Sequence, residues 1–201
     1  MGLFTRRAPG AVLPPAVVTA LELAKGERVL AFGVDDKTGG YVVATTFALA
    51  VVILAPRPST ANTPHAESSV AVSSTRPSST AERTLRRRWL SVDAGAWEPG
   101  AGTLTVTWAD GGRGVQWSFQ DQETRLPEVL RERVQASVVI ATRLTLGDRR
   151  SGRVAIRQDF ATRELIQQTI LGRYTHADDP EVQAHVQAAQ AHLRDQVGLP
   201  A

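Results

Sequence analysis

The chain has 201 residues, 42% of them hydrophobic, and a formal net charge of +3. This length fits one ordinary domain or one small domain with an appendage, and so small a charge surplus argues against nucleic-acid binding as a function. Because the sequence contains no cysteine, disulfides, a thiol nucleophile and cysteine-ligated zinc are excluded. The arginine-, alanine- and valine-rich composition is typical of a high-GC bacterial genome, and the lack of cysteine is compatible with a cytoplasmic location.

The first 24 residues read as an N-terminal extension that contains a short helix. Within residues 16–24, Val17, Ala20, Leu21 and Ala24 recur at helical spacing and share one face,. Several prolines and a glycine interrupt the apolar residues before this helix. They prevent the continuous apolar core that a signal peptide needs.

The apolar run at 41–55 raises the question of a membrane anchor. A helix that crosses a bilayer needs about 20 predominantly apolar residues, whereas this run ends at Pro56 and follows the charged residues 35–37. Its valine, threonine and isoleucine favour strands, so we expect no transmembrane segment. The turn at 46–47 is unusual, because neither residue readily adopts positive φ. The predicted strands are 28–34, 41–45 and 48–54.

The next segment, 56–84, is mostly serine, threonine, proline and alanine. It cannot bury enough apolar surface to offset the entropy of ordering, which predicts a disordered insertion. Strands resume after it, first at 88–99, which reads as one strand or as a strand pair with a kink at Gly95. Two further strands, 103–109 and 115–119, alternate apolar and polar residues, as expected for an antiparallel meander with one solvent-exposed face,.

The C-terminal third changes periodicity twice. Residues 126–140 carry apolar residues at spacings of three and four, which predicts a helix. A hairpin of strands 153–160 and 164–172 follows. The terminal helix has Asp179 as its N-cap, Pro180 in its first turn and Gly198 as its stop signal. Its predicted apolar stripe is Val182, Val186, Ala189, Leu193 and Val197.

Two segments carry a resemblance to a known class of protein. The stretch "GGYVVATTFALAVVIL" (39–54) and the helix "LPEVLRERVQASVVI" (126–140) resemble the corresponding parts of bacterial PH-like domains, and also of a high-GC bacterial family of unknown function. The resemblance implies an α+β fold, in which a curved antiparallel sheet or barrel is capped by a helix. It places the PH-like domain at 25–140, including the insertion, and a β-hairpin with the C-terminal helix at 141–201.

Motifs of catalysis and metal binding are absent from the sequence. There is no G-x-S-x-G, Walker A, H-E-x-x-H or EF-hand pattern,. His185 and His192 lie about 10 Å apart along a helix, too far to chelate one ion, so we expect half-buried packing side chains. Asp35 and Asp36 are expected to form a solvated turn. We therefore predict no enzyme activity, no cofactor and no metal.

The segment "RTLRRRW" is the sharpest candidate for a binding site. Four arginines and a tryptophan at the end of the insertion could hold a phosphate, an anionic headgroup or an acidic partner. Alternation along a strand would split the arginines between two faces, so a charged strand that protects a sheet edge is the favoured interpretation. The candidate residues are Arg83, Arg86, Arg87, Arg88 and Trp89.

These observations predict non-enzymatic binding or scaffolding. The expected partner is an unknown protein, docked on an exposed strand edge or along the terminal helix. The alternative is peripheral binding of an anionic membrane lipid or another polyanion through Arg83–Arg88.

Overall fold

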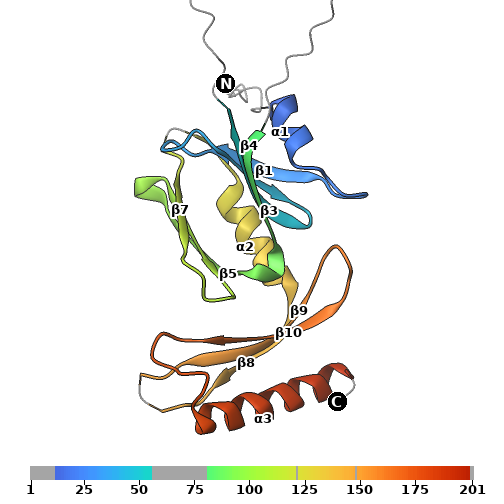
Figure 1. Cartoon of the computed structure of the whole chain (residues 1–201), viewed down its shortest axis with the longest axis vertical. Coiled ribbons are helices and arrows are strands. Elements are labelled where there is room, and N and C mark those ends of the chain that lie inside the picture. The colour runs from blue at the N-terminus through green and yellow to red at the C-terminus, as the bar shows by residue number, and fades with distance from the viewer. Residues whose placement is uncertain (1–11, 56–80, 121, 148, 200–201) are drawn as a thin grey trace, which may run out of the picture.

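The protein is α+β, with three antiparallel sheets and a C-terminal helix (Figure 1). The computed structural model describes residues 12–55, 81–120, 122–147 and 149–199. Pairings among these strands do not close any of the sheets into a barrel, so the barrel form of the sequence prediction is not found. None of the described helices is long and apolar enough to cross a membrane.

The first sheet has the order β1-β2-β3-β4. The three strands predicted before the insertion are confirmed, and α1 covers one face of this sheet through Val17 and Leu21, which pack on Val43, Ala50 and Val52. The elements are α1 (Pro15–Ala20), β1 (Val29–Val34), β2 (Tyr41–Thr45), β3 (Ala48–Leu54) and β4 (Ala81–Arg88).

The turn at 46–47 forms without positive φ at either residue. The Thr45 hydroxyl instead accepts hydrogen bonds from the backbone N–H groups of Phe47 (3.2 Å) and Ala48 (2.9 Å). The Thr46 N–H donates to the carbonyl of Arg28 at 2.9 Å. A threonine side chain thus replaces the glycine or asparagine that such a tight turn usually requires.

The second sheet has the order β5-β6-β7, and the segment leading into it corrects two predictions. Residues 81–84 already belong to β4, so the predicted insertion ends earlier, and its remainder, 56–80, lies outside the described residues. The strand expected at 88–99 is broken at Trp89–Ser91, because the Trp89 side chain turns into the core. The elements are η1 (Trp89–Ser91), β5 (Val92–Glu98), η2 (Pro99–Ala101), β6 (Thr103–Trp108) and β7 (Val115–Ser118).

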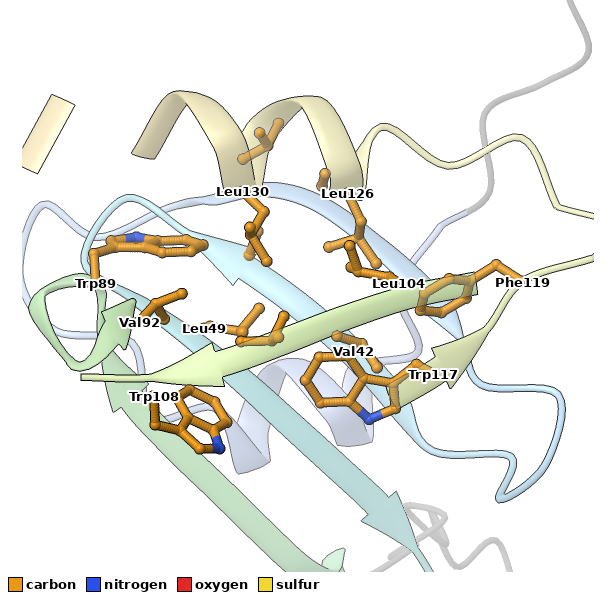
Figure 2. Packing of buried hydrophobic residues seen from close by; sticks show 14 residues of the cluster. Val42, Leu49, Trp89, Val92, Leu104, Trp108, Trp117, Phe119, Leu126 and Leu130 are labelled. Carbon is orange, nitrogen blue, oxygen red and sulfur yellow. The ribbon is translucent and has the colours of Figure 1, made fainter. Parts of the chain in front are cut away.

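Helix α2 (Leu126–Ser137) lies between the first two sheets and contacts β1, β2 and β5. In Figure 2 its Leu126 and Leu130 point toward Leu104 and Trp89 in the main core. The helix is three residues shorter than predicted. Residues 138–140 are β-branched and begin β8 instead, where pairing with β9 outweighs their helical spacing,.

The third sheet has the order β10-β9-β8, and α3 covers one of its faces. Strands β8 (Val138–Leu144), β9 (Gly152–Gln158) and β10 (Leu165–Leu171) confirm the predicted hairpin and add a strand to it, and α3 spans Pro180–Val197. The domain boundary expected after residue 140 falls inside β8.

The terminal helix has the predicted ends and the predicted apolar stripe. Asp179 Oδ1 accepts the N–H of Glu181 at 2.9 Å, and Gly198 adopts the left-handed conformation. The stripe packs on the third sheet. His185 and His192, however, are exposed rather than half-buried, because they lie beside the stripe and point to solvent.

Candidate functional site

Arg86 lies on the outer face of β4, which is the face that α1 covers, and forms an ion pair within the protein. Its guanidinium bonds the buried Glu27 carboxylate and donates to the carbonyl of Leu21 at 2.6 Å. Burial acts to raise the pKa of Glu27, but hydrogen bonds from the Thr45 hydroxyl, the Ala24 N–H and Arg86 outweigh it and hold that pKa below its usual value,. Arg86 therefore joins β4 to the segment that follows α1.

Arg87 faces the other side of β4 and bridges to the second sheet. Its guanidinium lies 4.4 Å from the ring centroid of Trp108 and donates to Asp110 Oδ2 at 2.9 Å. Hydrogen bonds from the Gly112 N–H and from Arg87 lower the pKa of Asp110. Stacking and a charge-assisted bond thus hold this side chain in place.

Arg88 and Trp89, the last two predicted site residues along the chain, also make structural contacts within the protein. Arg88 bonds Asp159, whose side chain is only 1% exposed. Trp89 is likewise 1% exposed and donates its indole N–H to the carbonyl of Thr45 at 2.9 Å. The five predicted residues therefore do not form one recognition surface, and the alternation of Arg86 and Arg88 against Arg87 agrees with the strand geometry expected from the sequence.

Arg83 differs from the other three arginines. It is exposed and forms no ion pair with any described residue. It lines a cleft of about 270 Å³ between the first sheet and β7. Of the predicted site residues, Arg83 is the one that borders this cleft.

The cleft has apolar walls with polar groups at its border. One wall is a patch on the inner face of β3 and β4, where Val51 pairs across the strands with Leu85, and Ile53 with Arg83. The opposite wall comes from β7, through Val115, Gln116 and Trp117, and the turn after β1 completes the lining with Asp35 and Thr38. Such a mixture of apolar surface and a few polar groups is typical of binding sites.

The carboxylates of Asp35 and Asp36 are structural. Asp35 is 2% exposed, which corrects the expectation of a solvated pair, and it accepts hydrogen bonds from Thr38 and from the Ser118 N–H. Asp36 accepts from the Gln120 N–H and the Ser118 hydroxyl, and these bonds lower its pKa. Both residues tie the turn after β1 to the end of β7. In the described part of the chain, no group of three or more acidic or histidine side chains could hold a metal ion.

Strand β4 is an edge of the first sheet. Among the described strands it pairs with β3 alone, so one side of its backbone is left without a strand partner. Leu85 is 41% exposed beside this edge. Sequence reasoning singled out the arginines and overlooked this residue, although a single leucine among arginines in "RTLRRRW" is the signal that could have found it.

A second feature that the sequence did not reveal is the buried Arg157 on β9. It is 2% exposed and donates to the carbonyls of Trp89 (2.9 Å), Leu90 (3.0 Å) and Val92 (2.7 Å) and to the Ser137 hydroxyl. These bonds join the third sheet to η1 and to the end of α2.

The electrostatics of Arg157 reflect its surroundings. Burial lowers its pKa to about 10, and the neighbouring charge of Arg153 acts in the same direction, against Asp93. Arg153 itself bonds Asp93 on β5, and the side-chain amide of Gln168 donates to the carbonyl of Leu90 at 2.9 Å. The third sheet is thus attached through these polar contacts and through Phe160, in the turn between β9 and β10, which packs against the main core, whereas the buried apolar residues of the third sheet form a separate cluster.

Comparison with known proteins gives no further guide to this site. No protein-family model matches the chain, and neither does any curated protein or solved structure.

Proposed function

We propose that residues 29–137 form a PH-like domain, and that the protein acts in the bacterial cytoplasm by binding a partner protein without catalysis. Support for the fold comes from the order of its elements, a four-stranded sheet, a three-stranded sheet and then a helix. Helix α2 fills the space beside β1 and β5. The cleft lies elsewhere, at β3, β4 and β7.

The observation that carries this proposal is the combination of the cleft with the edge of β4. An edge strand can add a strand from another chain through backbone hydrogen bonds, while side-chain pockets provide specificity. Here the edge carries the exposed Leu85 beside an apolar cleft that also contains Val115 and Trp117. Both requirements of strand addition are met at one place.

Two other sites have weaker support. Polyanion binding through Arg83–Arg88 would compete with the internal ion pairs of Arg86, Arg87 and Arg88. Docking along α3 would have to use its polar faces, because its apolar stripe packs on the third sheet.

A pair of matched variants tests the proposal. Leu85 is 41% exposed on β4, and Val18 is 42% exposed on α1, away from the cleft. Tagged wild-type protein, Leu85→Asp and Val18→Asp would be used to capture partners from lysate, and a photoreactive amino acid at position 85 or 18 would trap them in cells.

We expect proteins that are retained by the wild type and by Val18→Asp but lost with Leu85→Asp, and that crosslink to position 85 but not to 18. Far-UV circular dichroism and thermal unfolding would verify that both variants are folded. If Leu85→Asp retained the same partners and position 85 gave no crosslink, the edge of β4 would not be the docking site.

A further inference from the structure

We infer that the partner presents an extended segment in which an apolar residue is followed, two positions later, by an acidic residue. This inference rests on the proposed function and specifies the chemistry of the docked chain. It depends on the side chains of the inner face of β4, on the charge that Arg83 leaves unpaired among the described residues, and on the direction of an added strand.

Three residues alternate along the inner face of β4. Arg87 is fixed over Trp108 and bonded to Asp110, and Leu85 and then Arg83 follow on the same face, lining the cleft. In order along β4, this face therefore carries a cation that already has an acidic partner, then an apolar side chain, and then a cation that has no acidic partner among the described residues.

An added strand would match this order with its own alternate residues. Side chains two apart on a strand lie on one face and about 6.8 Å apart, which is also the spacing between Leu85 and Arg83. An apolar side chain opposite Leu85 would enter the cleft toward Val115 and Trp117. The next side chain on that face would lie opposite Arg83, where a carboxylate would form a charge-assisted hydrogen bond.

The direction of the segment follows from an antiparallel arrangement. Every strand pair in the described part of the chain is antiparallel. In an antiparallel addition to β4, the residue opposite Leu85 precedes the residue opposite Arg83. The expected order is therefore apolar, any residue, acidic. The intervening residue would lie on the outer face, where Arg86 already has the Glu27 carboxylate as its partner.

Two synthetic peptides of identical composition test this spacing. Each has ten residues in a serine and threonine background and an N-terminal fluorophore. In the first peptide a glutamate follows a leucine by two positions, and in the second the leucine and the glutamate are adjacent. Fluorescence anisotropy would measure their binding to the full chain.

We expect the first peptide to bind about tenfold more tightly, since the second cannot place both side chains on the inner face. Arg83→Gln should weaken the first peptide by about tenfold, and replacing the peptide's glutamate with glutamine should do the same without altering the protein. Arg131→Gln is the control, because Arg131 is exposed on α2 and forms no ion pair with described residues. Methylation of single backbone nitrogens of the peptide should abolish binding at every second position and leave it unchanged at the positions between.

Equal binding of the two peptides, or no binding of the first at millimolar concentration, would overturn the inference. So would an unchanged affinity with the glutamine peptide. If position 85 still crosslinked a cellular partner in those cases, the proposed docking site would stand and only the inferred partner chemistry would be wrong. Failure of the crosslink as well would refute both.

Discussion

Replacing Arg157 with methionine should destabilise the protein and loosen the attachment of its third sheet. The substitution keeps an unbranched side chain but removes all five guanidinium N–H donors. The carbonyl of Val92 would then lose the side-chain donor that Arg157 provides, whereas the carbonyl of Leu90 would keep the amide of Gln168 and the carbonyl of Trp89 would keep the backbone N–H of Val92. The Ser137 hydroxyl would lose its guanidinium partner as well.

The magnitude follows from the acceptors that are left unsatisfied. An acceptor that is left unsatisfied on burial costs about 1–3 kcal/mol, so the carbonyl of Val92 and the hydroxyl oxygen of Ser137, which both lose their guanidinium donor, correspond to roughly 2–6 kcal/mol,. Removing the buried charge offsets part of this loss, because desolvation opposes the charged form and lowers its pKa to about 10,. We therefore expect a net loss of about 3 kcal/mol in the free energy of unfolding.

Urea unfolding followed by two probes would measure both effects. All four tryptophans lie at 89–117, in η1 and the second sheet, so their fluorescence reports on the main core, whereas far-UV circular dichroism also reports on α3. In Arg157→Met we expect the dichroism to change at lower urea than the fluorescence, since separate transitions indicate loss of cooperative unfolding. The control is Arg131→Met, at an exposed position of α2.

The reasoning would be refuted if Arg157→Met lost less than about 1 kcal/mol, or no more than Arg131→Met. Coincident transitions by the two probes would show that Arg157 does not couple the third sheet to the rest of the chain.

Three further predictions concern single contacts. A Cβ at Gly95 would overlap Leu130 Cδ2, so Gly95→Ala should lower the free energy of unfolding, measured in urea, by about 1–3 kcal/mol. In a Leu130→Ala background the same substitution should lower it by less. If the losses of the two single variants simply added in the double variant, the overlap would not be the cause. The pKa of Glu27 is lowered in the folded state, so the folded protein binds fewer protons than the unfolded chain in acid, and stability should fall as the pH drops below about 4.5. In urea titrations between about pH 5 and pH 2, the free energy of unfolding of Glu27→Gln should change less with pH than that of the wild type. Glu132→Gln, at an exposed position, should keep the pH dependence of the wild type. Asp179→Ala removes the N-cap of α3 and should cost about 1 kcal/mol, which thermal unfolding would detect; an unchanged midpoint would mean that the cap contributes nothing.

The candidate site shows how far the sequence could lead. Its pattern located an arginine-rich edge strand and split Arg86 and Arg88 from Arg87, because alternation is a local property of extended backbone. It could not identify their acidic partners. Glu27 lies 59 residues from Arg86, and Asp159 lies 71 residues from Arg88, so those pairs exist only once distant segments pack together.

The ends of two elements show the same limit. The helical spacing of 126–140 continues past Ser137, yet the chain leaves the helix there to pair Val138 with β9. The strand expected at 88–99 breaks at Trp89, which has its hydrogen-bond partner on Thr45. In both cases a long-range contact prevails over the local periodicity.

By itself, the sequence determined the elements whose information is local. The alternating strands β6 and β7, the paired strands β2 and β3 and the capped helix α3 follow from side-chain period and capping residues, which act within a few positions of the chain. Only the tertiary structure decided that Leu85 and Arg83 would line a cleft with Trp117, and that Arg157 would be buried against η1. Burial, charge pairing and concave surfaces depend on which distant segments meet, and that is a property of the packed chain.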